Sequence, residues 1–420
     1  MWALQDARLP DGRTADILVD GAQIAEVGEG AASQAAERIV CAGKLVLPGF
    51  IDGHVHLDKV LIRDELSEHD GTLAGAIGAI HERKRRYTVD DVRVRATAII
   101  EESVRLGTTR LRSHVDVDTI GGLAPLEGVK AAASDCAGIA EVRTIAFPQE
   151  GLLRDPGAHS LMEAALEAGA DVVGGMPHWE LDEASQREHV RLCFDLAERF
   201  DRDLDMHVDE TDDGAIRTLE MVADEALARG FTGRVCAGHV CSLSAADDAY
   251  AGRVIDKCLR AGISIAANPV TNLVLQGRRD RGLIRRGTTR IGEFRAAGVN
   301  VLFGQDCVKD GFYPFGRGSM LEVALISAHA AHLTTREDIE YALRAITDAP
   351  AQAMGLTDYG LRKGDRADMQ LLPVGSWPEA LRLQPIPEKV WFRGRLVAES
   401  SVRSEIHRST PPSAARPSDA

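Results

Sequence analysis

The sequence first excludes several protein classes through what it lacks. None of its apolar runs reaches the length of about 18 residues that a membrane-spanning helix needs, and no basic segment followed by an apolar core opens the chain. The seven cysteines are odd in number and form no Cys-x-x-Cys pair, which is typical of reduced thiols. We therefore expect a cytoplasmic protein that is neither secreted nor bound to a membrane.

Positive charge is scarce relative to negative charge. The chain has 49 Lys and Arg against 64 Asp and Glu, which gives a formal net charge of −15. This balance argues against nucleic acid as a partner and favours a neutral or cationic small molecule. The hydrophobic content of 45% over 420 residues is typical of a globular protein with a large buried core.

Motifs that would identify other enzyme classes are missing too. Residues 28–33 lack the third glycine of a dinucleotide-binding turn, and the sequence has neither a P-loop nor a His-Glu-x-x-His helix. These absences weigh against a doubly wound nucleotide-binding sheet, which is the alternative arrangement of alternating strands and helices.

The middle of the chain alternates short apolar runs with helix-like segments such as 90–106 and 184–200. Eight apolar runs can be counted, at residues 46–51, 109–117, 141–147, 170–176, 204–208, 234–240, 263–267 and 299–303. This alternation is typical of a parallel sheet of the α/β class, and eight such units close into a (β/α)8 or TIM barrel.

Both ends of the chain have the pattern of short β-strands. Strand-like runs with tight turns fill residues 1–45, and similar runs return at 368–373 and 389–398. We predict a small β-sandwich domain built from residues 1–45 and 356–400, around a catalytic barrel at 46–355. Ser, Pro, Arg and Ala dominate residues 401–420, which predicts a disordered tail.

His54 and His56 follow the first apolar run of the predicted barrel. Alternate residues of a strand face the same side, so the two imidazoles point together. A neutral imidazole is a common ligand of zinc and iron. A bare His-x-His pair is nevertheless more often two half-buried histidines at a strand end, so the pair needs support from other strands.

Polar residues also follow the other apolar runs, at the barrel end where catalytic groups lie. Six of the 13 histidines fall there. In chain order the strand-end residues are His54 and His56, His114 and Asp116, Gln149 and Glu150, His178 and Glu180, His207 and Glu210, His239, Asn268 and Asp306. The accumulation favours one shared site. His114 with Asp116 fits a structural pair as well as a reacting one, and His178 fits the pocket wall as well as the core.

Four of these residues form a suitable ligand set for a metal ion: His54, His56, His207 and Asp306. The fourth strand end has no lysine that could bridge a second ion, so we expect one divalent ion, zinc or iron. Such an ion would make hydroxide available near neutral pH. Glu210 could then carry a proton to a substrate nitrogen, His239 could orient the attacked centre, and Asp306 could also accept a proton.

The segments 47–59, 113–116, 146–151, 206–210, 268–278 and 303–306 together resemble the amidohydrolase superfamily. More narrowly they resemble its cytosine deaminase branch, since the Phe-Pro-Gln-Glu-Gly and Asn-Pro-x-x-Asn motifs are specific to that branch. The resemblance extends from the N-terminal sheet to about residue 400. It implies hydrolytic deamination of a free pyrimidine base with release of ammonia, and a homo-oligomer, because relatives are often oligomers.

The resemblance also implies roles for individual residues. The family's metal ligands, usually of iron or zinc, match His54, His56, His207 and Asp306. Glu210 matches its proton shuttle and His239 its hydroxide-orienting histidine. Gln149 matches the glutamine that pairs with the edge of the pyrimidine ring, and Phe312 falls where the family carries an aromatic residue against the ring.

One position departs from the branch. Cys307 stands where cytosine deaminases carry a second aspartate, directly after the metal aspartate. A thiol is smaller and much less hydrophilic than a carboxylate, so the exchange opens space for an apolar substituent at ring position 5. We therefore predict 5-methylcytosine as the preferred substrate, with plain cytosine as the alternative. Hydrolysis of an aminotriazine or another cyclic amide, and a catalytically silent metal-binding protein, are the competing interpretations.

Overall fold

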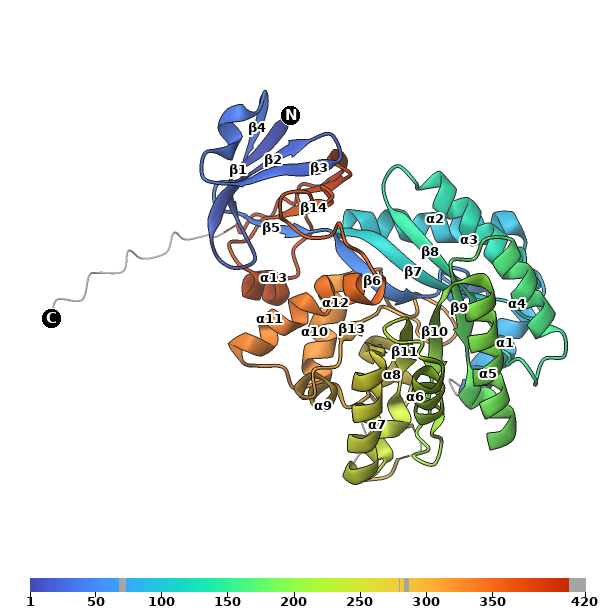
Figure 1. Ribbon diagram of the computed structural model, residues 1–420. Helices are drawn as coiled ribbons and strands as arrows, with labels where there is room; N and C mark the ends of the chain where they lie inside the picture. Colours follow the sequence, from blue (N-terminus) through green and yellow to red (C-terminus); the bar gives the residue numbers. More distant parts are fainter. Residues whose placement is uncertain (68–72, 279, 283–286, 408–420) are drawn as a thin grey trace.

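A parallel eight-stranded sheet forms the centre of the computed structural model, which describes residues 1–67, 73–278, 280–282 and 287–407 (Figure 1). Its strands follow one another in sequence order. They are β6 (Phe50–Val55), β7 (Thr108–Asp116), β8 (Glu141–Phe147), β9 (Val172–Gly175), β10 (Asp203–Val208), β11 (Val235–His239), β12 (Ser264–Ala267) and β13 (Val301–Phe303). A bridge between Val55 and Asp306 joins the first strand to the segment after the last and closes the barrel.

Helices surround the barrel (Figure 1). They are α1 (Leu73–Lys84), α2 (Val89–Arg105), α3 (Ala124–Asp135), α4 (Ala158–Glu167), α5 (Glu183–Phe200), α6 (Thr218–Arg229), α7 (Asp248–Ala261), α8 (Pro269–Leu275), α9 (Ile291–Ala296), α10 (Met320–Ala330), α11 (Arg336–Arg344) and α12 (Asp348–Ala353). Their boundaries follow from local chemistry. A capping box between Asp182 and Ser185 starts α5, and α7 buries Val254, Cys258 and Ala261 at helical spacing.

The chain ends form a second sheet beside the barrel, where the blue N-terminal strands meet the red C-terminal ones (Figure 1). Its order is β16 (Arg395–Glu399), β15 (Lys389–Phe392), β14 (Met369–Leu372), β5 (Leu45–Pro48), β1 (Trp2–Arg8), β2 (Thr14–Asp20) and β3 (Gln23–Gly28), with β4 (Glu37–Val40) paired to β1. Trp2 stacks on Trp391 in its core at 5.4 Å between ring centroids. The helix α13 (Trp377–Leu383) follows β14 and packs against α10 and α11. The predicted barrel with a β-structured unit from both termini is confirmed.

Ion pairs place this second sheet at the N-terminal ends of the barrel strands. Arg366 lies 2.7 Å from Glu141, the first residue of β8, and Arg110 near the start of β7 lies 3.4 Å from Asp368. The opposite, C-terminal end of the barrel therefore stays available for a site.

The prediction that residues 46–51 form the first barrel strand is wrong. Leu45–Pro48 is β5 of the second sheet, where it pairs with β14, and the barrel strand β6 begins at Phe50. The chain passes from one sheet to the other at Gly49. A side chain does not fit at this position, because a Cβ would lie 2.3 Å from Oγ1 of Thr109. The apolar run spans two strands since both are buried, so hydrophobicity alone does not show where one ends.

Three other expectations concern the chain as a whole. All seven cysteines are buried and free of disulfides. Within the described residues, no helix is both long and apolar enough to cross a bilayer. Of the predicted disordered tail at 401–420, residues 401–407 belong to no helix or strand, and residues 408–420 lie outside the described residues.

Candidate metal and catalytic site

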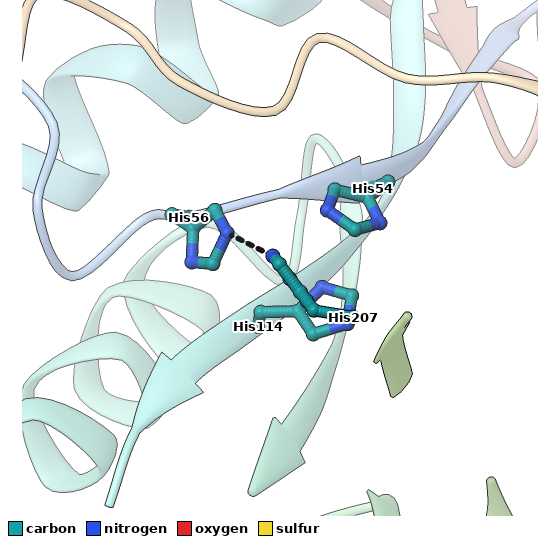
Figure 2. Close-up of side chains that lie close together, drawn as sticks. All are labelled: His54, His56, His114 and His207. Atoms are coloured by element: carbon teal, nitrogen blue, oxygen red, sulfur yellow. Dashed lines mark hydrogen bonds between the residues drawn. The ribbon is translucent and has the colours of Figure 1, made fainter. Parts of the chain in front are cut away.

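Four buried histidines converge at the C-terminal ends of three barrel strands (Figure 2). His54 belongs to β6 and His56 follows its last residue, while His114 comes from β7 and His207 from β10; one ring nitrogen of each lies within 4.8 Å of the others. The two Nε2 atoms of His56 and His207 are only 3.0 Å apart. The alternation of β6 therefore points its two imidazoles into a common cluster, as the sequence predicts.

Asp306 completes the predicted ligand set. Its Oδ1 lies 3.3 Å from Nε2 of His56 and 3.5 Å from Nε2 of His54, and the carboxylate also groups with His207 within 4.8 Å. The residue has a left-handed backbone (φ 64°), an uncommon conformation for a residue other than glycine. The structure thus brings all four predicted ligands together.

The chemistry of these residues fits a transition metal. Both ring nitrogens of His54, and Nδ1 of His56 and of His207, are buried without a hydrogen-bond partner, a state that buried polar atoms rarely keep. Burial lowers the pKa of His56 to about 3 and the pKa of His207 well below its usual value, so both rings are neutral and offer lone pairs. Imidazole and carboxylate donors of this kind suit zinc and iron.

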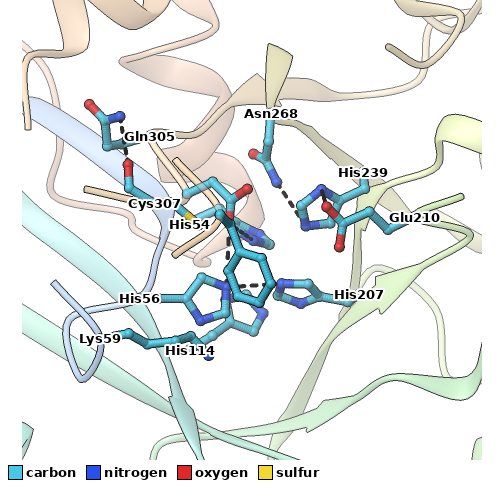
Figure 3. A network of polar contacts seen from close by, with 12 residues as sticks. His54, His56, Lys59, His114, His207, Glu210, His239, Asn268, Gln305 and Cys307 are labelled. Carbon is cyan, nitrogen blue, oxygen red and sulfur yellow. Dashed lines mark hydrogen bonds and ion pairs between the residues drawn. The ribbon is translucent and has the colours of Figure 1, made fainter. Parts of the chain in front are cut away.

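Glu210 lies in a polar group beside the histidines (Figure 3). Its Oε1 lies 3.2 Å from Nδ1 of His239 and accepts a hydrogen bond from Asn272 at 3.1 Å. Asn268 contacts the other nitrogen of His239, Nε2, at 3.3 Å. Burial and the charge of Asp306 raise the pKa of Glu210 well above its usual value. A carboxyl group with a raised pKa can hold and release a proton near neutral pH.

The structure separates His114 from Asp116, which the sequence left as a possible pair. The ring of His114 belongs to the histidine cluster, with its centroid 4.2 Å from that of His54, and its Nε2 lies 3.4 Å from Asp205. Asp116 faces two lysines instead, Lys59 and Lys84. Sequence reasoning did not assign His114 to the cluster, although its place at a strand end was a usable signal.

A cavity of about 280 Å³ opens next to these groups. Gln149, Cys307 and Phe312, which the sequence predicts to bind the substrate, line this cavity, and His178 also belongs to its wall. Glu180 has another role: it accepts hydrogen bonds from the backbone of residues 152–154 and pairs with His189.

Sequence reasoning missed two kinds of residue around the cavity. The apolar wall consists of Ile77, Met176, Trp179, Ile216 and Leu275, which the sequence does not distinguish from core residues. The polar residues Lys59 and Asn272 were visible inside the motifs of residues 47–59 and 268–278, but they had no assigned role.

Comparison with known proteins gives consistent matches. A family model described as "Amidohydrolase family" matches residues 87–398. The 5-methylcytosine deaminase from Klebsiella pneumoniae superposes with a TM-score of 0.92 and 34% identity, over 96% of this chain and 99% of that one. The N-isopropylammelide isopropylaminohydrolase from Burkholderia multivorans ATCC 17616 superposes with a TM-score of 0.83 and 28% identity, over 95% and 98%.

A sequence relative extends this picture. The pterin deaminase of Rhizobium rhizogenes is 31% identical over 406 residues, which is 94% of this chain and 88% of that protein. The matches confirm the predicted resemblance to amidohydrolases of the cytosine deaminase type, and they show a hydrolase that acts on carbon–nitrogen bonds. Because the family model and the relatives span most of its length, this chain belongs to the amidohydrolase family.

Proposed function

We propose that this chain is a metal-dependent hydrolytic deaminase that converts 5-methylcytosine to thymine and ammonia. The observation that carries the proposal is the position of Cys307. Its buried side chain lines the cavity directly after Asp306, so a neutral thiol borders the space where a ring would lie. Burial and the Asp306 carboxylate raise the pKa of this thiol well above its usual value, which keeps it uncharged.

The surroundings of Cys307 favour an apolar substituent on the ring. The side chain of Cys307 interacts with that of Asp310, whose Oδ1 accepts hydrogen bonds from the backbone of Phe312 and Tyr313 at 2.9 and 2.8 Å. This turn holds Phe312 at the cavity, where its ring can pack against a planar substrate. A substrate methyl group between the Cys307 thiol and the Phe312 ring displaces no hydrogen bond. A carboxylate at position 307 would instead place a charge against this apolar methyl group.

His54, His56, His207 and Asp306 would hold one divalent ion, zinc or iron. A bound ion of this type lowers the pKa of water and supplies a nucleophile near neutral pH. The remaining chemistry belongs to the side chains. In the overall reaction a water oxygen bonds to the amino-bearing ring carbon, the carbon–nitrogen bond breaks, and ammonia leaves.

Glu210 is the residue suited to move protons in this reaction. Its carboxylate can accept a proton from water and return it to a ring nitrogen or to the leaving amine. His239 can present its Nδ1 proton to Glu210 or Asn272 while Asn268 contacts its Nε2, and these contacts fix the orientation of the ring. Gln149 also lines the cavity and is suited to hold the edge of the substrate.

A larger aminoheterocycle such as a pterin is the second candidate. The cavity of about 280 Å³ leaves room beyond a single pyrimidine ring, and Trp179 and Leu275 extend its apolar wall. The pterin deaminase at 31% identity supports this alternative.

Ammonia release by the metal-replete protein tests the proposal directly. The panel comprises 5-methylcytosine, cytosine, isocytosine, ammelide, creatinine and pterin. The proposal predicts the highest kcat/KM for 5-methylcytosine. A highest kcat/KM for cytosine would support the deaminase assignment and reject the argument from Cys307. A highest kcat/KM for pterin would support the second candidate.

A further inference from the structure

Lys59 is a buried cation directly behind the cavity wall. It follows the metal-binding segment of β6, its side chain is 1% exposed, and its Nζ contacts Oδ1 of Asp116. The same Nζ donates a hydrogen bond of 2.9 Å to Oε1 of Gln149. Figure 3 shows Lys59 on the His56 side of the histidine cluster, away from Glu210 and His239. Glu210, the proton-transfer group, and Lys59 therefore lie at different walls of the site.

The contact with Lys59 fixes which way the Gln149 amide faces. An ammonium group has three N–H donors and no acceptor, so only the carbonyl oxygen of the amide can face it. The reverse orientation would press the amide NH2 against a buried ammonium, so that two donors would meet with no acceptor between them. The other end of the amide agrees, because Nε2 of Gln149 lies 3.4 Å from the sulfur of Met176, a weak acceptor.

Neighbouring charges keep Lys59 in place. Asp116 is shared with a second buried lysine, Lys84, whose Nζ lies 2.5 Å from Oδ2 of Asp116 and 2.6 Å from Asp118. Both oxygens of Asp116 are thereby engaged, one by each lysine. Among the interactions of the described residues, Lys59 donates a hydrogen bond to Gln149 and Lys84 does not; Lys84 contacts Asp118 and Glu150 instead.

We propose that Lys59 is a positioning residue that sets the polarity of Gln149, so that Gln149 offers the substrate N–H donors and no acceptor. This inference rests on the proposed deaminase function, and it names the class of substrate. The ring must present an acceptor at the edge facing Gln149, either a carbonyl oxygen or an unprotonated ring nitrogen. Cytosine and 5-methylcytosine have such an acceptor in the carbonyl oxygen O2, which leaves N3, next to the amino-bearing carbon, for Glu210. A ring that turns an N–H toward Gln149 is rejected because two donors would meet.

The test compares cytosine with 2-thiocytosine, in which a sulfur, a weaker acceptor, replaces the oxygen at position 2. The readout is the ratio of the two kcat/KM values. Gln149→Leu gives the reference value of this ratio for a cavity wall that offers the substrate no N–H donor. In Lys59→Met the amide is free to turn, so the ratio should fall about threefold to tenfold toward that of Gln149→Leu, mainly through KM for cytosine. Lys84→Met is the matched control, since it removes the other buried partner of Asp116 and should leave the ratio unchanged.

Two outcomes would overturn the inference. The first is an unchanged ratio in Lys59→Met, and the second is an equal fall of the ratio in Lys84→Met, which would indicate a general structural effect. If Lys59→Met does not fold, Gln149→Glu carries the test. Its carboxylate keeps an oxygen toward Lys59 but turns a second acceptor toward the substrate, so cytosine should lose more activity than 2-thiocytosine.

A stability measurement separates this inference from the proposed function. Melting temperatures of Lys59→Met, Gln149→Leu and the double variant form a cycle that needs no substrate. If the two side chains are in direct contact, the melting temperature of the double variant should fall by less than the sum of the two single decreases, because each single change already breaks the same hydrogen bond. Additive losses would overturn the inference, even if the chain deaminates pyrimidines. If no pyrimidine is turned over, the proposed function fails while a non-additive cycle still supports the Lys59–Gln149 contact.

Discussion

The backbone N–H of Asp306 donates to the carbonyl of His54 at 2.7 Å, and the N–H of His56 donates to the carbonyl of Asp306 at 3.0 Å. The first and last strands of the barrel are thus joined through the same residues that the sequence predicts as metal ligands. The spacing of the ligands and the closure of the barrel therefore depend on the same backbone contacts.

Gly304→Ala should disturb both properties. A Cβ at this position would lie 2.6 Å from Cβ of His54 and 2.6 Å from Oδ1 of Asn268, so β6 and the segment after β13 must move apart. Overpacking of this kind costs about 1–3 kcal/mol of unfolding free energy. We expect a lower urea midpoint together with a reduced metal content, measured by denaturation and elemental analysis.

Gly252→Ala provides the matched control. Gly252 lies inside α7, and an added Cβ would meet nothing within 4 Å. Alanine is the better helix former, so this variant should gain up to about 1 kcal/mol and keep its metal. An unchanged metal content in a folded Gly304→Ala protein would contradict the link between closure and ligand spacing.

Glu210→Gln should abolish turnover without releasing the metal. The amide keeps the shape of the side chain but cannot accept and return a proton, so kcat should fall about a hundredfold to ten-thousandfold. Elemental analysis and ammonia release on the same preparation measure both quantities. Glu220→Gln on α6, where Glu220 pairs with Lys257 at 2.8 Å, should change turnover little. Loss of the metal with Glu210→Gln would instead indicate a structural ion.

The sequence predicted the part of the site that depends on the position of residues within strands. The His-x-His spacing placed His54 and His56 on one face, and the strand-end rule collected His207, His239 and Asp306 from distant parts of the chain. The structure brings these residues together, while their roles in catalysis stay predictions.

Contacts between side chains could not be predicted in the same way. Lys59 and Gln149 are 90 positions apart in the chain, and no periodicity links a lysine to the amide it orients. His114 has Asp205 as its carboxylate partner, while Asp116 contacts Lys59 and Lys84, and the sequence did not show this exchange of partners. The apolar run across Gly49 hid a change of sheet for a related reason: hydrophobicity reports burial and not the identity of the neighbouring strand.

Cys307→Asp should move the preference from 5-methylcytosine toward cytosine. A carboxylate is larger and more hydrophilic than the thiol, and it would occupy the space proposed for the methyl group beside Asp306 and Asp310. One methyl group in a fitted pocket changes kcat/KM by roughly tenfold to two-hundredfold, so the ratio of the two substrates should fall by a factor in that range. Cys136→Ser changes a buried thiol at the end of α3, outside the cavity, and should leave the ratio unaltered. Equal turnover of both bases in the parent and in Cys307→Asp would reject the role of the thiol.

The stability of the folded chain should decrease as the pH falls below neutral, and His189 is one identifiable cause. Its Nε2 accepts a hydrogen bond from the backbone N–H of Met176 at 3.0 Å, so the proton sits on Nδ1, which donates to Glu180 at 2.7 Å. Burial lowers the pKa of His189 although Glu180 opposes the shift. Protonation of Nε2 would also break the bond to Met176.

The sign of this effect follows from proton binding. An unfolded histidine takes up a proton as the pH falls through about 6.5, whereas the folded His189 stays neutral to lower pH. The unfolded state therefore binds more protons, and the free energy of unfolding drops as the pH goes from 7 toward 5. His189→Gln keeps an acceptor for Met176 and a donor for Glu180 but does not titrate, so urea denaturation at pH 7, 6 and 5 should give a shallower decline. A decline as steep as that of the parent would exclude His189 as a cause, since no other change separates the two proteins.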